Sequence, residues 1–402
     1  MSTRRPVVFS LEQALSLPYG TLRFVHLGWR VIRIEPTPVP GRQSWGDPNR
    51  HIGRQVAGED RHSYFVAPNV GKEAIALNLK SPRGREILHR LLRQLDADVF
   101  CTNTMPAHHR ALGIDHSTML ERHPELIWCS VSAMGLDHPD VPGYDPVIQA
   151  MCGFMDLTGD RSGPPTQCGP PVTDLKAGDE VFAQVLAAML ERHTTGRGTA
   201  IDISLACAAA SWLHTFTPLL DMGSPPEELR RNGNRHRQFI PVDSYPTADG
   251  FIYLAIGSDA QWHRLVKVPM FASLDEERFT TNERRRAHQD DLHELIAAIT
   301  SRHPSARVAA ALEDVAIPHS PITPIERVAD MTFVRNAALR TIAPDGRVVR
   351  LPPSAVRVPH LEELGRTLPF APAYGEHTDA VLGEAGIGNA EIGELRREGV
   401  VA

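Results

Sequence analysis

A carboxylate between a loop rich in Gly and Pro and a strongly periodic segment is the most informative residue of the sequence. Asp174 lies in GPPVTDLKAGDE, directly ahead of apolar residues that recur at three- and four-residue steps. Aspartate in this position is commonly an N-cap, because its oxygens accept hydrogen bonds from the free amides of the first helical turn. The same helix end stabilises an anion, so we also expect the carboxylate to stay ionised at neutral pH and to be able to attack an acyl group. The pattern alone leaves both roles open.

Other sequence patterns that carry chemistry are missing. The chain has no GxGxxG, Walker, HExxH or GxSxG motif, which argues against nicotinamide, P-loop, zincin and α/β-hydrolase chemistry. Its five cysteines are scattered without a CxxC pair, and the adjacent His108 and His109 would point apart on a helix. We therefore expect no metal site.

The elements that must position Asp174 alternate between strands and helices. Short apolar runs predict strands at 6–9, 30–35, 74–79, 97–101 and 126–131. Apolar periodicity predicts helices at 11–27, 82–95 and 175–193. Strands separated by helices of this length require parallel crossovers, so residues 1–205 are expected to form a doubly wound, Rossmann-like α/β domain.

A change of composition divides the rest of the chain. Residues 223–237 are rich in Pro and Arg and poor in apolar positions, so we assign 206–237 to a linker helix and loop. A predicted strand at 251–256 and predicted helices at 288–299 and 306–312 indicate a small α+β domain over 238–325.

The overall composition excludes several kinds of partner. Among 402 residues, 42 Lys and Arg stand against 48 Asp and Glu, which gives a net charge of −6 and no reason to expect a nucleic acid or a membrane surface as partner. No stretch approaches the roughly 20 apolar residues of a membrane span. The start of the chain lacks a signal-peptide core and the cysteines suggest no disulfide framework, so we expect a cytoplasmic protein.

Several separated motifs, in a consistent order, resemble one family. They are LGWRVIRIEP (27–36), NVGKEAIALNLKSPRGREIL (69–88), GYDPVIQAMCGFMDLTGD (143–160), GPPVTDLKAG (169–178), ERHTTGRGTAIDISL (191–205), SYPTADGFIYLAIGSDAQW (244–262) and GEHTDAVL (375–382). Together they resemble class III CoA-transferases, the group of formyl-CoA transferase and carnitine CoA-transferase. The resemblance covers nearly the whole chain and makes the nucleophile the favoured role of Asp174, which lies in the family's PxxDxxxG pattern.

The resemblance implies a transfer of CoA from an acyl-CoA, such as succinyl-CoA, to a small carboxylic acid, which we expect to be a dicarboxylate. Asp174 would attack the donor thioester to give a mixed anhydride, and the released CoA thiolate would convert this to an aspartyl-CoA thioester. CoA and acyl-CoA would be substrates, with no permanently bound cofactor. The family also implies an interlocked homodimer in which residues 326–402 return to the large CoA-binding domain.

Four further residues match positions of the family's site. Tyr144 of GYDP and Gly257 of AIGSDAQW correspond to active-site positions, and Lys80 of NLKSP and Arg110 of HHRALG to CoA contacts. Each also has an ordinary structural interpretation: a buried aromatic for Tyr144, a turn at a strand end for Gly257, and solvated cations for Lys80 and Arg110.

Two alternative functions remain open at this stage. A 2-methylacyl-CoA racemase of the same superfamily would use an Asp and a His base, but Tyr144 stands at the position of that His. The other alternative is a non-catalytic acyl-CoA-binding protein, which would not need the nucleophile motif.

Overall fold

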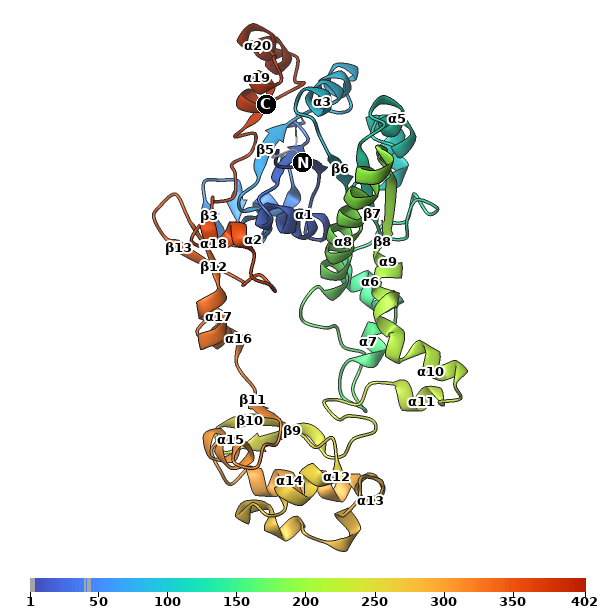
Figure 1. Cartoon of the computed structure of the whole chain (residues 1–402), viewed down its shortest axis with the longest axis vertical. Helices are drawn as coiled ribbons and strands as arrows, with labels where there is room; N and C mark the ends of the chain where they lie inside the picture. The colour runs from blue at the N-terminus through green and yellow to red at the C-terminus, as the bar shows by residue number, and fades with distance from the viewer. Residues whose placement is uncertain (1–3, 40, 42–44) are drawn as a thin grey trace. The chain divides into compact units, whose positions relative to one another are not determined.

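The computed structural model describes residues 4–39, 41 and 45–402, which fold into two units (Figure 1). The first unit contains the described residues up to 152 together with 169–214 and 331–402. The second contains 153–168 and 215–330. The fold is thus mixed α/β, and each unit is described by itself below.

A parallel sheet of six strands forms the centre of the first unit. Its strands are β1 (Val7–Leu11), β2 (Arg30–Glu35), β5 (Glu73–Ala76), β6 (Val99–Thr102), β7 (Ile127–Ser132) and β8 (Ala200–Ser204). They lie in the order β5-β2-β1-β6-β7-β8, and every neighbouring pair is parallel. From β1 the chain adds β2 and β5 on one side of the sheet. It then crosses back, so that β6 pairs with the other side of β1 and is followed by β7 and β8. The five predicted strands are confirmed, and β8 is an addition to them.

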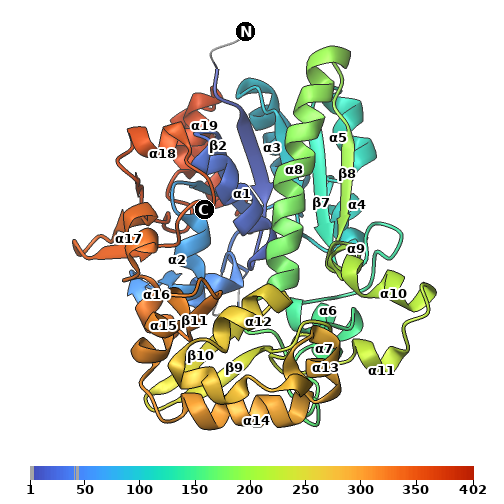
Figure 2. The same ribbon diagram turned by 60° about the horizontal axis from the view of Figure 1, so that its bottom comes forward.

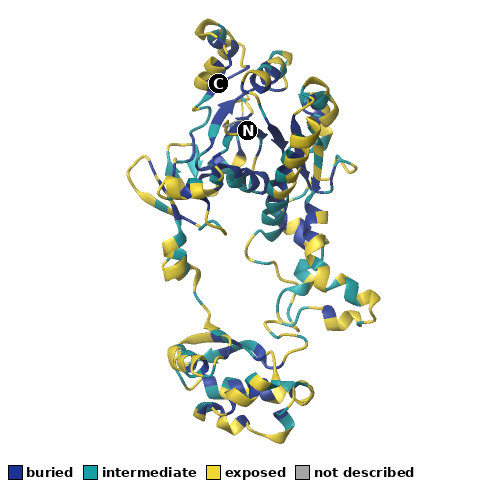
Figure 3. Ribbon diagram, viewed as in Figure 1, coloured by how far each residue is buried: buried dark blue, intermediate teal, exposed yellow. Residues whose placement is uncertain are grey.

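Helices cover both faces of this sheet. On one face, α3 (Pro82–Gln94), α5 (His116–Arg122), α19 (Thr378–Glu384) and α20 (Asn389–Arg397) share a buried core with the strands through residues such as Phe9, Leu91 and Leu395. On the other face, α1 (Ser16–His26) and α8 (Val172–Thr195) lie side by side in front of the strands (Figure 2). Apolar residues of β1, β2, β5, β6 and β7 face both layers, so these five strands are almost entirely buried, whereas the edge strand β8 is largely accessible (Figure 3).

The second unit has a small antiparallel sheet of β9 (Val242–Thr247), β10 (Gly250–Ala255) and β11 (His319–Pro321). Its helices include α12 (Asp259–Leu265), α14 (Gln289–Thr300) and α15 (Ser305–Glu313). Trp262, Phe271 and Phe279 are fully buried in its separate core. The strand predicted at 251–256 and the helices predicted at 288–299 and 306–312 are all present.

The first predicted helix was wrong at its start. The sequence predicts a helix from Leu11, whereas β1 continues through Leu11 and α1 begins only at Ser16. Glu12 explains the difference, because its carboxylate lies buried beneath the strand end, 2.7 Å from the Lys72 ammonium and 2.6 Å from the Thr21 hydroxyl. A buried charge needs such partners, and a helix starting at Leu11 would not place Glu12 between them.

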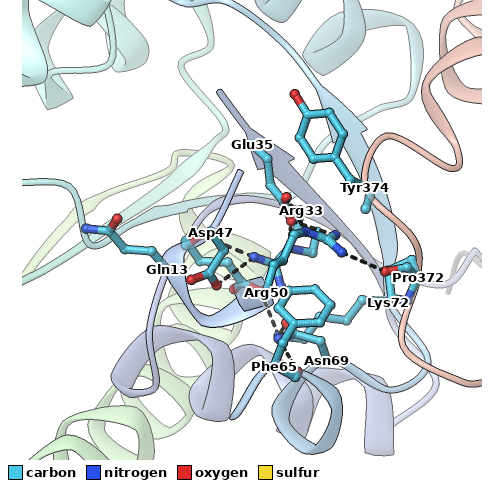
Figure 4. Close-up of polar contacts among 12 residues, drawn as sticks. Gln13, Arg33, Glu35, Asp47, Arg50, Phe65, Asn69, Lys72, Pro372 and Tyr374 are labelled. Atoms are coloured by element: carbon cyan, nitrogen blue, oxygen red, sulfur yellow. Dashed lines mark hydrogen bonds and ion pairs between the residues drawn. The ribbon is translucent and has the colours of Figure 1, made fainter. Parts of the chain in front are cut away.

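A cluster of buried ion pairs supports this end of the sheet (Figure 4). The Arg33 guanidinium lies 2.9 Å from the Asp47 carboxylate, and Arg50 lies 2.6 Å from Glu35, with all four side chains inaccessible to solvent. Arg50 also donates a 3.1 Å hydrogen bond to the carbonyl of Pro372, in the returning C-terminal part of the chain. The charged cluster therefore joins β2, the segment after it and the C-terminal segment.

Replacing one member of a buried pair tests this cluster. We expect Glu12→Gln to lower the free energy of unfolding by about 3 kcal/mol, because it leaves the buried Lys72 without its counter-charge. The double variant Glu12→Gln/Lys72→Met should recover part of the loss. Glu86→Gln, which removes the exposed partner of Arg122, is the control and should change stability little. Equal effects of the buried and exposed changes in urea unfolding would contradict this description.

Candidate active site

Asp174 lies in the first turn of α8 and is not its N-cap. The helix begins at Val172 with Pro171 in the capping position, so Asp174 is the third residue of the helix. The carboxylate makes no hydrogen bond or ion pair with any residue that the structure describes. The capping role was therefore wrong, and the side chain remains available for chemistry.

Asp145, which the sequence analysis did not single out, caps α8 instead. Asp145 is buried, with 3% of its surface exposed, and it is the first residue of the short helix α6 (Asp145–Met151). It accepts hydrogen bonds from the Thr173 amide at 2.8 Å, the Thr173 hydroxyl at 2.7 Å and the Gln149 side chain at 2.7 Å. The amide of Asp174 contacts the same oxygen at 3.4 Å. The first amides of α8 are thus directed to Asp145, and the GYDP motif was the signal that could have revealed it.

This arrangement places two carboxylates at one helix end. Burial, together with the negative charge of Asp145, raises the pKa of Asp174 to about 7. The expectation that Asp174 stays fully ionised at neutral pH was therefore wrong, because Asp145 occupies the amides that were expected to stabilise it. A carboxylate of raised pKa that ionises near neutral pH is a stronger base and nucleophile than an exposed one.

The glycine of the PxxDxxxG pattern permits close contact between α8 and α1. A Cβ atom on Gly178 would lie 2.7 Å from the carbonyl oxygen of Ser16, and one on Gly20 would lie 2.9 Å from the carbonyl oxygen of Gly178. The two helix backbones therefore touch at these glycines. Residues four apart share a helix face, so Asp174 lies on the same face of α8 as Gly178, one turn nearer the start of α8.

The functional segments of the first unit gather at the carboxyl edge of the sheet. α1 follows β1, α6 follows β7, and α8 precedes the parallel strand β8, so all three helices begin at that edge. The loops after β5 and β6 carry Lys80 and Arg110 to the same edge. Open α/β sheets bind ligands at the carboxyl ends of their strands.

Lys80 and Arg110 lie on neighbouring segments with exposed side chains. Lys80 follows β5, and Arg110 lies on α4 (His109–Leu112). The guanidinium of Arg85 joins the two segments, since it donates to the carbonyls of Leu79, Lys80 and Ala111, each at 3.3 Å. The structure thus brings both predicted CoA contacts to one side of the first unit, and no acidic side chain in the described part of the chain forms an ion pair with either.

Tyr144 and Gly257 lie in different units. Tyr144 directly precedes Asp145 and is 72% exposed, so its interpretation as a buried aromatic was wrong. Gly257 lies between β10 and α12 in the second unit, where its amide donates a 2.7 Å hydrogen bond to the side chain of Gln261. Its surroundings would leave room for a Cβ atom, with only that Gln261 oxygen nearby, at 3.5 Å.

The described residues contain neither a metal-binding cluster nor a helix that could span a membrane. Across 4–39, 41 and 45–402, no group of three or more His, Cys, Asp or Glu side chains is arranged to hold a metal ion. No helix in that part of the chain is both long and apolar enough to cross a membrane.

Comparisons with known proteins agree with one another. Residues 6–378 match the model of CoA-transferase family III. The succinate–glutarate CoA-transferase of Agrobacterium fabrum is 32% identical over 94% of each chain, and the acetyl-CoA:oxalate CoA-transferase of Acetobacter aceti is 31% identical over 90% of this chain and 93% of its own. The human succinyl-CoA:glutarate CoA-transferase is 27% identical over 98% of this chain and 88% of its own. Among solved structures, a CAIB/BAIF family protein from Brucella suis superposes with a TM-score of 0.81 at 28% identity, covering 94% of this chain and 98% of its own.

The charge of Asp145 adds to burial in raising the pKa of Asp174, and this contribution can be tested through the pH dependence of the reaction. The predicted nucleophile can attack only when it is ionised, so kcat/KM for CoA transfer should rise as the pH rises through about 7. Asp145→Asn removes a charge that raises this pKa, so the rise should move to lower pH. Glu191→Gln, an exposed change on the same helix, should leave the profile in place. A profile of Asp145→Asn that stays in place or moves to higher pH would contradict the assigned electrostatics.

Adding a methyl group at Gly178 should separate α1 from α8. Because the new Cβ would meet backbone atoms of α1, we expect Gly178→Ala to cost about 2 kcal/mol in thermal unfolding and to lower activity. Gly393→Ala is the matched control, since Gly393 also lies within a helix but has no atom near its Cβ position. The control should be neutral or slightly stabilising. The helix contact would be excluded if both variants behaved alike.

Proposed function

The chain belongs to CoA-transferase family III and is an enzyme that transfers CoA; from this we propose that it moves CoA from a donor such as succinyl-CoA to a small dicarboxylic acid. The relatives named for succinate and glutarate support this choice of donor and acceptor. The observation that carries the mechanism is the carboxylate of Asp174, which has no partner among the described residues and a pKa raised to about 7.

In the proposed reaction, an oxygen of Asp174 attacks the thioester carbon of the donor. The C–S bond breaks, giving a mixed anhydride and CoA thiolate. The thiolate then attacks the aspartyl carbonyl and releases the donor acid, which leaves an aspartyl-CoA thioester. The acceptor carboxylate attacks that thioester, and the thiolate released attacks the new acyl carbonyl, so that acyl-CoA leaves and Asp174 is restored. No step consumes water, so the thioester energy is conserved.

Other parts of the proposal extend from this centre. Lys80 and Arg110 would hold the phosphates of CoA, which suits two exposed cations at the same sheet edge. Tyr144, beside Asp145, would line the acyl site. Gly257 would bind an oxyanion through its amide, for which it would first have to release Gln261.

The proposed assembly is an interlocked homodimer in the cytoplasm. Its large domain would be Rossmann-like and formed by 1–205 and 326–402, joined through 206–237 to a small domain at 238–325. Two observations support this division into domains. The strand order of the first unit is that of a doubly wound sheet, and the second unit lies in the sequence between the two main parts of the first. The cytoplasm keeps thiols reduced, which suits a chain with five free cysteines.

The two alternative functions lose their support. A non-catalytic binding protein disagrees with the family assignment. A racemase would need an imidazole where the chain has the exposed Tyr144.

A transfer assay with an acid panel tests the proposal. The protein is incubated with succinyl-CoA and a series of mono- and dicarboxylic acids, and the new acyl-CoA is measured. We expect transfer to a dicarboxylate, a loss of at least about 10³-fold for Asp174→Asn, and an unchanged rate for Glu191→Gln. Absence of transfer to every acid, or full activity of Asp174→Asn, would reject the proposed function.

A further inference from the structure

The first turn of α8 offers no free backbone amide to the Asp174 carboxylate. A helix leaves the amides of its capping residue and of its first three residues without partners inside the helix. In α8 these four positions are Pro171, Val172, Thr173 and Asp174. The partners of their amides decide whether the Asp174 carboxylate is bound or free.

Two of the four positions are held by Asp145. The Thr173 amide donates to its Oδ1 atom at 2.8 Å, and the Asp174 amide lies 3.4 Å from the same oxygen. Asp145 is buried, and Gln149 donates to its other oxygen at 2.7 Å, so this carboxylate is fixed in place. The side chain of Asp174 therefore cannot bind these amides without displacing Asp145.

Two consecutive prolines account for the other two positions. The Val172 amide donates to the carbonyl of Pro170 at 2.8 Å, which closes a three-residue turn around Pro171, with φ −75° and ψ 71°. The carbonyl of Pro171 accepts the first hydrogen bond within the helix, from the Leu175 amide at 3.1 Å. Pro171 itself has no N–H to donate. All four positions are thus either occupied or without a donor.

The N–H that Pro171 lacks is the one that an acidic residue at the third helical position commonly binds. In a capping box, the side chain of the third residue reaches back and accepts from the backbone amide of the capping residue. Asp174 is the third residue of α8, and any residue other than proline at position 171 would present that amide to it. The proline therefore withholds the backbone donor that would complete this contact.

Charged side chains do not replace the missing donor. Burial and the charge of Asp145, the one charged residue of α6, raise the pKa of Asp174. The helix α9 (Leu205–Ser211) and the strand β7 carry only thiols as titratable groups. The remaining groups on α8 and its neighbours have partners of their own: Tyr19 and Arg23 of α1 contact Asp179, Lys176 pairs with Glu180, and Asp202 of β8 accepts from the Leu136 amide.

We propose that Pro171 is a positioning residue, which keeps the Asp174 carboxylate free to attack the acyl-CoA thioester by withholding the amide of a capping box. This inference rests on the proposed function. A backbone hydrogen bond would stabilise the carboxylate as an anion, and it would have to weaken when the same oxygen forms its bond to the thioester carbon. Pro171 acts only through Asp174 and needs no contact with the substrate.

Two substitutions that supply the missing amide test this role. Pro171→Ala and Pro171→Ser each add an N–H at the capping position, and serine also favours folding because it is a preferred capping residue. We expect the pH midpoint of kcat/KM for CoA transfer to fall by about one unit from about 7, because the new donor stabilises the ionised form. Above the midpoint, kcat should fall about tenfold, with KM values within about threefold of wild type.

A matched control and a second readout accompany these variants. Pro170→Ala loosens the same loop but adds its amide one residue outside the capping position, so its midpoint and kcat should match wild type. The carboxyl carbon-13 resonance of Asp174, assigned by its absence in Asp174→Asn, reports the ionisation of this side chain without any reaction. Its titration midpoint should also fall in both Pro171 variants and stay in place in Pro170→Ala.

The outcomes separate this inference from the proposed function. If the wild-type protein transfers no CoA to any acid, the proposed function fails, and the carbon-13 titration alone decides whether Pro171 withholds a donor. If the wild type is active and the Pro171 variants keep the wild-type midpoints or raise them, only the role of Pro171 is overturned. An equal shift in Pro170→Ala would also overturn it, because loosening of the loop would then explain the change.

Discussion

Two carboxylates, Asp145 and Asp174, share the start of α8, and the chemistry proposed for Asp174 depends on this pairing. Asp145 is buried and accepts the hydrogen bonds that the first turn of α8 offers, so Asp174 is left half-buried, beside a negative charge and without a hydrogen-bond donor among the described residues. A carboxylate placed in this way is held at higher free energy than one in water. That energy is relieved when the side chain is protonated or acylated, which explains why this aspartate suits covalent chemistry.

The rest of the first unit maintains this placement. The glycine contact between α1 and α8 brings the loop after β1 to the same sheet edge as Asp174, and Asn103 fixes that loop. The buried pair of Arg33 and Asp47 supports this loop from the protein interior. In the same charged cluster, Arg50 donates a hydrogen bond to Pro372 in the C-terminal part of the chain. Burying so many charges costs free energy, so such clusters are better explained by a precise local geometry than by stability alone.

Much of the fold was predictable because its signals are local. Short apolar runs located β1, β2, β5, β6 and β7, and apolar periodicity located the long helix α8. The position of Asp174 between a loop rich in Gly and Pro and this helix made it a candidate for the site. The environment of Asp174 was not predictable, because it depends on Asp145, 29 residues away across a loop rich in Gly and Pro. The start of α1 was misjudged for the same reason: Glu12 interrupts the helix through Lys72, 60 residues away. The role of Gly178 also appears only once α1 is seen against α8.

Mass spectrometry can detect the proposed covalent link between Asp174 and CoA. The protein is mixed with succinyl-CoA without acceptor, quenched and digested, and the peptide that contains Asp174 is weighed. We expect this peptide to gain the mass of CoA less one water, hydroxylamine to remove the added CoA, and the Asp174→Asn variant to show no such addition. An unmodified Asp174 peptide in a preparation that transfers CoA at its full rate would contradict the covalent link.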